Sequence, residues 1–206
     1  MMATFAIGLG VFVVSYLAGS VPSAYLLTRS LRGVDIRTLG SGNPGAVNVY
    51  KHVGPWAGVL VLATDALKGA AVVVAVRSLD LGDGAFFLAA MGAVIGHNWP
   101  VFLGFRGGKG IAVIFGVSLS VLPLWTILTL AIALSAGVAT RSVVFGIAAG
   151  IVALNAFAIA TGQGAVEISL CLTLSALVVA THYALGYRQV LAAVRRRGLW
   201  GLFEVE

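Results

Sequence analysis

Long apolar runs follow one another along almost the whole chain, and short polar segments separate them. A helix that crosses about 30 Å of hydrocarbon needs about 20 mostly apolar residues, and fewer where the bilayer is thin. The pattern therefore predicts an all-α, polytopic membrane protein with about seven transmembrane helices. The uncharged or nearly uncharged runs are 3–28, 54–76, 84–105, 111–123, 124–139, 143–161 and 164–187.

The fourth and fifth runs are short, and Pro123 lies where they meet. Proline lacks a backbone N–H and is disfavoured in the interior of a helix, so we expect a turn at this point. One undivided helix over 111–139 is the alternative, and it would reverse the orientation of every later span.

The distribution of cations favours seven spans with the N-terminus outside and the C-terminus in the cytoplasm. In that arrangement Arg77 is the one cation left outside, near Asp80 and Asp83, and Lys68 falls within a span. Cytoplasmic loops carry the excess of lysine and arginine in most membrane proteins. The cytoplasmic cations are then Arg29, Arg32, Arg37, Lys51, Arg106, Lys109, Arg141, Arg188, Arg195, Arg196 and Arg197.

Composition supports a single membrane-embedded domain over 1–206. The chain is 60% hydrophobic and 10% charged, with a mean hydropathy of +1.04. A soluble domain carries about 25% charged residues. The net charge of +6 is scattered among loops, which fits anionic lipid better than a nucleic acid. The stretch 1–20 lacks a basic segment before its apolar run, so we read it as a retained first span.

The segment 35–51 combines glycines with polar side chains. Glycine permits unusual backbone dihedrals, and bare N–H groups can then converge on an anion. A flexible linker would explain the glycines but not the polar residues among them, so we predict a phosphate-binding loop. An accidental G-x-G-x-x-G match lacks the strand and helix that a dinucleotide site needs. The candidate residues are Arg37, Ser41, Gly42, Asn43, Gly45, Asn48 and Lys51.

A second polar cluster covers 96–110 and leads directly into an apolar run. Three glycines surround Lys109, which suggests an anion site at the start of a helix. Leu103 and Gly110 break the Walker A pattern, so nucleotide hydrolysis is not implied. His97 can serve as a proton carrier or simply hydrogen-bond the loop. The candidate residues are His97, Gly107, Gly108, Lys109 and Gly110.

Asp65 and Lys68 are charged positions inside the second run, spaced to meet on one helix face. Ionisable groups within a span are costly and usually face a polar interior. Lys68 is therefore either half of a buried ion pair or a direct ligand of the substrate. Arg141 and His182 complete the set of polar residues on the cytoplasmic side.

Other chemistries do not fit these residues. We find no zinc-ligand spacing, no arrangement suited to a Ser-His-Asp triad, and no paired aspartates for metal-dependent phosphoalcohol transfer. We expect no metal or cofactor. A cation- and amide-lined pocket at the inner membrane surface suits a phosphorylated substrate.

The ordered motifs resemble those of the bacterial acyl-phosphate:glycerol-3-phosphate acyltransferases. The resemblance covers most of the chain, and several motifs in the same order at consistent spacing are far more specific than any one. The motifs are Gly19-Ser-Val-Pro22, Asp35-Ile-Arg37, Gly40-Ser-Gly-Asn-Pro-Gly-Ala46 with Asn48, Asp65-Ala-Leu-Lys-Gly69, Gly96-His97, Pro100-Val-Phe102 and Gly107-Gly-Lys-Gly110.

The resemblance implies seven transmembrane helices in the bacterial plasma membrane, with the active site facing the cytoplasm. It implies acyl transfer from an acyl phosphate to the 1-hydroxyl of glycerol 3-phosphate, giving lysophosphatidate and phosphate. Ser41 and Asn43 would lie beside the acyl phosphate. Lys109 and Lys51 would hold phosphate groups, and His182 would position the substrate. The soluble enzyme that makes the acyl phosphate is an expected partner.

The sequence departs from the family pattern at several positions. Two hydroxyls and one amide are lost, and lysine replaces an arginine that could bind phosphate in bidentate fashion. An altered acceptor and a weakened paralogue are therefore open interpretations, as are a small anion or phosphate transporter and a non-catalytic partner of lipid enzymes. The departures are Val47, Lys51, Val113, Ser142, Val144 and Leu185.

Overall fold

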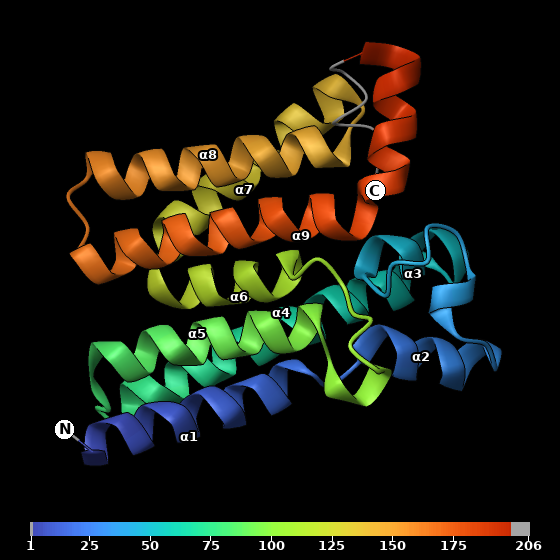
Figure 1. Ribbon diagram of the computed structural model, residues 1–206. Helices are drawn as coiled ribbons and strands as arrows, with labels where there is room; N and C mark the ends of the chain where they lie inside the picture. Colours follow the sequence, from blue (N-terminus) through green and yellow to red (C-terminus); the bar gives the residue numbers. More distant parts are fainter. Residues whose placement is uncertain (1, 199–206) are drawn as a thin grey trace. The chain divides into compact units, whose positions relative to one another are not determined.

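The computed structural model describes residues 2–198, and within them all regular structure is helical (Figure 1). The chain divides into two compact units, Met1–Ser120 and Val121–Glu206. Among the described residues, 6 helical stretches are long and apolar enough to cross a membrane. They are Thr4–Arg32, Pro55–Ser78, Gly82–Leu103, Pro123–Thr140, Val143–Ala160 and Ala165–Ala184.

The apolar stretch around Pro123 is divided, as the sequence predicts. Helix α6 (Ile111–Val121) ends just before the proline, and α7 (Pro123–Thr140) begins at it. Leu122 between them has φ −132° and ψ 64°, which no helix accepts. The expectation of a polytopic all-α membrane protein is confirmed. With 11 residues α6 is shorter than the other apolar helices, so the count of seven and the orientation stay predictions.

The first unit contains the helices that carry both predicted glycine loops. Helices α1, α4 and α5 run side by side through it, and α2 and α3 lie together at one end (Figure 1). The elements are α1 (Met2–Gly19), α2 (Ser23–Arg32), η1 (Ile36–Thr38), α3 (Ala46–His52), α4 (Pro55–Ser78), α5 (Gly82–Asn98), η2 (Val101–Leu103) and α6.

Small residues let α1 and α5 approach until their backbones touch. A Cβ added at Gly92 would lie 2.7 Å from the carbonyl oxygen of Phe12, and one at Gly96 would overlap the carbonyl of Tyr16. Gly19 meets the backbone of Ala93 in the same way. Helices in membranes often pack through such glycines because lipid offers no hydrophobic drive for association.

A second close crossing joins α4 to α6. A Cβ at Gly69 would overlap the carbonyl oxygen of Val113, and one at Gly116 would overlap that of Ala66. The start of α6, where the second glycine loop ends, is therefore held against the middle of α4.

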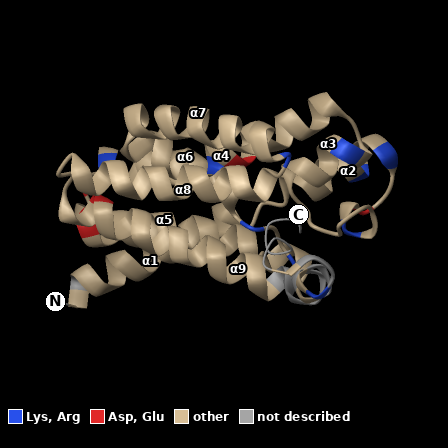
Figure 2. Cartoon of the chain, turned by 90° about the horizontal axis from the view of Figure 1, so that it is seen from above, with Lys and Arg blue, Asp and Glu red and all other residues tan. Residues whose placement is uncertain are grey.

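Charge is distributed unevenly over the first unit. Lysines and arginines gather at the end that carries α2 and α3 (Figure 2). Helix α2 is amphipathic, with Arg29 and Arg32 in its last turn and Thr28 buried. The α4–α5 turn carries Asp80 and Asp83 instead. This asymmetry is the one that the positive-inside rule requires for a cytoplasmic end.

The second unit consists of α7, α8 (Val143–Ala160) and α9 (Ala165–Arg197). Gly146 and Gly150 of α8 lie against the backbone of α7 around Ala133. Asn155 donates a hydrogen bond of 2.7 Å to the Ser175 hydroxyl, which links α8 to α9. Leu122, Ala158 and Cys171 form a buried apolar cluster within this unit.

Candidate active site

The first glycine loop is folded around the side chain of Asn48. Its Nδ2 lies 3.3 Å from the carbonyl oxygen of Ile36, 3.0 Å from that of Leu39 and 3.0 Å from that of Asn43. Asn48 is 3% exposed, so these contacts replace the water that the amide would otherwise bind. The amide therefore shapes the loop, and its predicted contact with substrate stays a prediction.

Two glycines give this loop a conformation that other residues rarely adopt. Gly40 has φ 51° and Gly42 has φ 74°, both in the left-handed region. A Cβ on Gly40 would also collide with the His52 ring. Ser41 is thereby held at the tip of the turn, where its side chain is exposed and its Oγ accepts a 3.4 Å hydrogen bond from the Asn43 N–H.

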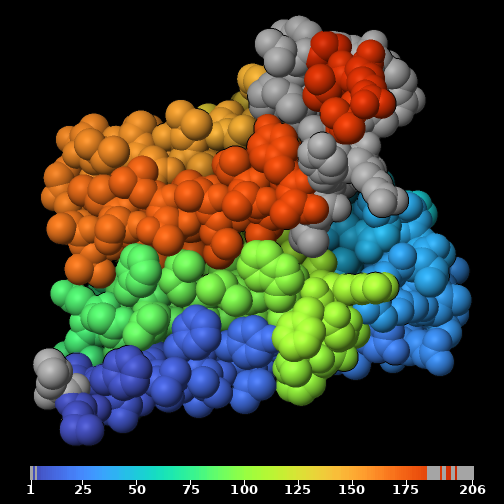
Figure 3. All heavy atoms as spheres, viewed as in Figure 1, coloured from blue at the N-terminus to red at the C-terminus, as the bar shows by residue number. Residues whose placement is uncertain are grey.

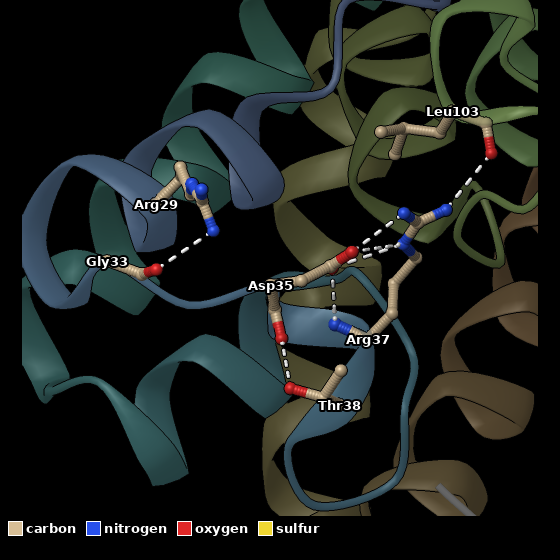
Figure 4. Close-up of polar contacts among 6 residues, drawn as sticks. All are labelled: Arg29, Gly33, Asp35, Arg37, Thr38 and Leu103. Atoms are coloured by element: carbon tan, nitrogen blue, oxygen red, sulfur yellow. Dashed lines mark hydrogen bonds and ion pairs between the residues drawn. The ribbon is translucent and has the colours of Figure 1, made fainter.

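Arg37 joins this loop to the second one. Its guanidinium donates to both carboxylate oxygens of Asp35, the shortest contact being 2.7 Å, and its NH1 donates to the carbonyl of Leu103 at 3.0 Å (Figure 4). Segments 33–45 and 99–110 lie against each other (Figure 3). The hydrogen bonds from Arg37 hold the pKa of the Asp35 carboxyl below its usual value, and the carboxylate in turn raises the pKa of Arg37.

The second glycine loop turns back over the last carbonyls of α5. The N–H of Gly107 donates to the carbonyl of Asn98 at 3.2 Å, and that of Gly108 donates to the carbonyl of His97 at 3.1 Å. These two donors satisfy groups that a helix C-terminus leaves unpaired. The first turn of α6, which follows Gly110, is then the backbone surface on which an anion can bind.

Lys109 lies between the folded glycines and α6 and is only 8% exposed. Gly110 after it has φ 77° and rests on the buried side chain of Asn98. The amide atoms of Asn98 have no hydrogen-bond partner within residues 2–198. Asn98 is not among the residues predicted from the sequence. Asn98 is fully buried beneath Gly110, whose backbone has a positive φ. This burial, which only the structure shows, is what marks Asn98 as part of the loop.

A third cluster connects α4 to the second loop. The Lys68 ammonium lies 2.9 Å from the Asp65 carboxylate, 3.0 Å from the carbonyl of Val21 and 3.0 Å from Nδ1 of His97. The Asp65 side chain is 2% exposed. The predicted ion pair of α4 is therefore present and buried, and it extends to His97.

The comparisons with known proteins bear on the same residues. The family described as glycerol-3-phosphate acyltransferase matches residues 9–190, a range that includes both loops and the α4 cluster. The chain belongs to this family. Relatives named glycerol-3-phosphate acyltransferase include one from Halalkalibacterium halodurans, 48% identical over 134 residues, and one from Geobacter sulfurreducens, 37% identical over 169 residues.

These relatives are matched over different shares of their length. The first alignment covers 64% of this chain and 65% of the relative, and the second covers 82% and 87%. A solved structure also matches, with a TM-score of 0.81 and 30% identity over 90% of this chain and 92% of the other. It is the crystal structure of PlsY, an integral membrane glycerol 3-phosphate acyltransferase, in its glycerol 3-phosphate form.

The predicted site residues of the second unit lie at the α7–α8 junction and on α9. Arg141 ends α7 in a left-handed conformation, with φ 53°, and is exposed. Ser142 caps α8 by accepting a hydrogen bond from the Phe145 N–H. The ring of His182 makes an edge contact with Tyr183, at 5.4 Å between ring centres. The side chain of Leu185 lies outside the described ones. Participation of Arg141 and His182 in one site with the two loops stays a prediction.

Proposed function

We propose that this protein transfers a fatty acyl group from an acyl phosphate to the 1-hydroxyl of glycerol 3-phosphate, as the entry step of phospholipid synthesis. The family match over residues 9–190 carries this proposal, because it includes every cation-bearing loop described above. The related crystal structures support it, since PlsY was solved in a glycerol 3-phosphate form and a lysophosphatidic acid form.

The reaction requires neither a protein nucleophile nor a protein base. The 1-hydroxyl oxygen attacks the acyl carbonyl carbon, a new ester bond forms, and the bond from that carbon to the phosphate oxygen breaks. The released phosphate takes the hydroxyl proton, so no protein base is required. An acyl phosphate is already activated, and catalysis then depends on holding two anions together and on stabilising the developing oxyanion.

The two joined loops are suited to this task. Exposed Ser41 and the neighbouring Asn43 present neutral donors to the acyl phosphate. Lys109 and the start of α6 hold a phosphate group, and Lys51 at the end of α3 adds a second cation. The Arg37–Leu103 hydrogen bond keeps the loops side by side, so both anions reach the same place.

An open groove in the first unit offers a place for the acyl chain. It has a volume of about 630 Å³ and is lined by α2, α4 and the end of α1, mainly with apolar side chains. Leu26, Leu27 and Leu60 line its length, and Lys68 also borders it. Volumes of about 300–1,000 Å³ are typical of small-molecule sites. The groove supports a lateral path by which an acyl tail enters from the bilayer.

The proposed location is the bacterial plasma membrane, with the loops facing the cytoplasm. Both substrates are anionic and water-soluble at one end, so a cytoplasmic site gives them access. The proposed partner is the soluble enzyme that supplies the acyl phosphate.

Membranes that contain the protein test the proposed reaction directly. With acyl phosphate and glycerol 3-phosphate together, we expect equal amounts of phosphate and lysophosphatidate. With acyl phosphate alone, we expect neither product beyond spontaneous hydrolysis. A folded wild-type protein that forms no lysophosphatidate would contradict the proposal. A panel of other acceptor alcohols then shows whether the departures at Val47 and Lys51 have changed the acceptor.

Lys109→Ala tests the role of the second loop. Removing a buried cation at the reacting phosphate is expected to lower kcat by about 10²–10³-fold, the usual effect of losing one preorganised electrostatic contact. Arg106→Ala is the matched control, because this exposed cation lies three residues earlier in the same segment. Equal activity of the two variants would show that the loop has been assigned wrongly.

Anion transport is the alternative that the same cations allow. It requires flux of labelled phosphate into proteoliposomes without any acyl donor. We expect no such flux above the level of empty vesicles, because Lys68 and Asp65, the charges in the middle of α4, bind each other.

A further inference from the structure

The ammonium group of Lys68 contacts three groups of the protein. Asp65 Oδ1, the carbonyl oxygen of Val21 and Nδ1 of His97 lie within 2.9 to 3.0 Å of its Nζ. An ammonium carries three protons and has no acceptor. One ion pair and two hydrogen bonds therefore occupy the Lys68 ammonium, which favours the first of the two roles left open by the sequence, half of an ion pair, over a direct ligand of the substrate.

This arrangement decides which nitrogen of His97 carries the ring proton. A ring nitrogen that contacts an ammonium must accept, so Nδ1 is unprotonated and the proton of the neutral imidazole sits on Nε2. The reverse arrangement, a neutral amine accepting from an Nδ1–H, would leave the buried Asp65 carboxylate without its counter-charge. An uncompensated buried charge is strongly destabilising, so the ion pair favours the first arrangement.

The protonated edge of the ring lies against the second glycine loop. A Cβ added at Gly108 would overlap Nε2 of His97, and the N–H of Gly108 donates to the backbone carbonyl of His97. Nε2 is thus placed at the residue directly before Lys109. Glycine is needed at 108 because any side chain would displace the ring.

We infer that Lys68 is a positioning residue that holds His97 in its Nε2–H tautomer, so that His97 presents a neutral N–H donor to a phosphate oxygen bound at the Lys109 loop. The inference rests on the proposed function. It also assigns His97 a role other than proton transfer, because its Nδ1 is bound to an ammonium and its Nε2 already carries a proton. Release of the hydroxyl proton to the departing phosphate agrees with this assignment.

The tautomer can be read directly by NMR on the full-length protein. Long-range proton–nitrogen correlation of ¹⁵N-histidine-labelled protein in nanodiscs distinguishes an Nε2–H ring from an Nδ1–H ring. The chain has three histidines, and the His97→Asn variant assigns the relevant signal. We expect the Nε2–H pattern in wild type. An Nδ1–H or doubly protonated His97 would overturn the inference without touching the proposed reaction.

Variants at position 68 test the link between the lysine and the tautomer. Lys68→Met removes the donor, and we expect the His97 signal to change to a mixture of forms. Asp65→Asn with Lys68→Met is the companion variant, because it avoids a lone buried carboxylate and keeps the test valid if the single variant fails to fold. Arg77→Gln, a cation change on the same helix, should leave the His97 signal unchanged.

Kinetics give the functional half of the test. We expect the double variant to lose about tenfold in kcat with a smaller change in the KM for glycerol 3-phosphate. Lys68→Arg, which also only donates, should restore the tautomer and most of the rate. An unchanged tautomer together with a lost rate would assign Lys68 a purely structural role and overturn the inference. Absence of acyl transfer in wild type is a separate outcome, which overturns the proposed function itself.

Discussion

At the residue scale, the same side chain can bind a substrate or hold two segments of the protein together, and its contacts in the structure distinguish these roles. Arg37 lies among glycines in a loop suited to phosphate, which is why the sequence suggests a ligand. In the structure its guanidinium binds Asp35 and reaches the carbonyl of Leu103. That carbonyl is 66 positions away. No local sequence pattern indicates a hydrogen-bond partner so far along the chain, so the hydrogen bond from Arg37 to Leu103 could not be predicted.

Local pairs behave differently. Asp65 and Lys68 are three positions apart on one helix, and helix geometry alone brings them together. The extension of this pair to His97 depends on the packing of α5 against α4. The sequence therefore predicts the Asp65–Lys68 ion pair. The contact between Lys68 and His97 becomes visible only once the helices are packed.

Asp35→Asn tests the Asp35–Arg37 ion pair. Asparagine keeps the capping oxygen for η1 but removes the charge. Partly exposed pairs are worth about 0.2–1 kcal/mol, so we expect a melting temperature lower by up to about 4 °C at pH 7. The measurement is thermal unfolding in detergent, with Asp80→Asn, an exposed aspartate of the α4–α5 turn, as control.

The pH dependence of this difference has a definite sign. The pKa of Asp35 is lower in the folded protein than in the unfolded chain, so its stabilisation is present above the unfolded value. It is lost as the pH falls through the folded value. The gap between wild type and Asp35→Asn should therefore stay constant from pH 8 to pH 5 and narrow below about pH 4. A gap that persists at pH 3 would show that the charge is not its source.

At the element scale, loop geometry changed how the second glycine cluster works. Its pattern predicts backbone N–H groups converging on an anion. Gly107 and Gly108 instead satisfy the last carbonyls of α5, and the candidate backbone donors shift to the first turn of α6. The role of these residues in an anion site stays a prediction. Which backbone N–H groups bond to α5 and which remain for an anion could not be predicted, because this depends on how the chain reverses after η2.

The groove beside α4 gives an element-scale prediction about chain length. Leu60 lines the groove and Leu62 does not, yet both are α4 leucines with nearly equal exposure, 43% and 45%. Leu60→Trp should narrow the groove and raise the KM for long-chain acyl phosphates several-fold more than that for short-chain ones. Leu62→Trp should leave this ratio unchanged. Equal shifts in the two variants would place the acyl chain elsewhere.

At the scale of the whole molecule, hydropathy alone yields the fold class because about 20 apolar residues per span are hard to mistake. The number of spans is harder to predict, since a count of six or seven depends on whether α6 crosses the bilayer. Its 11 residues reach about 16 Å at 1.5 Å per residue, roughly half of the hydrocarbon core. The distribution of cations predicts that α6 is a span, and the helix break at Leu122 separates α6 from α7 as that prediction requires.

Cysteine labelling decides between these arrangements. Cys171 is buried and can be replaced by serine to give a background without thiols. With seven spans and the N-terminus outside, Asp80→Cys and Gln163→Cys lie outside and react with an impermeant maleimide on intact cells. Val34→Cys reacts only after the cells are opened, because it lies beside the cytoplasmic loops.

Gln163→Cys is the decisive position in this set. If α6 does not cross the bilayer, every later span reverses and this thiol becomes cytoplasmic, whereas Asp80→Cys and Val34→Cys keep their sides. Labelling of Asp80→Cys but not Gln163→Cys on intact cells would therefore remove α6 from the count of spans. It would also put Arg141 outside and His182 toward the outer face, away from the two loops. The prediction that Arg141 and His182 act together with Lys109 requires the opposite result, since all three must then face the cytoplasm.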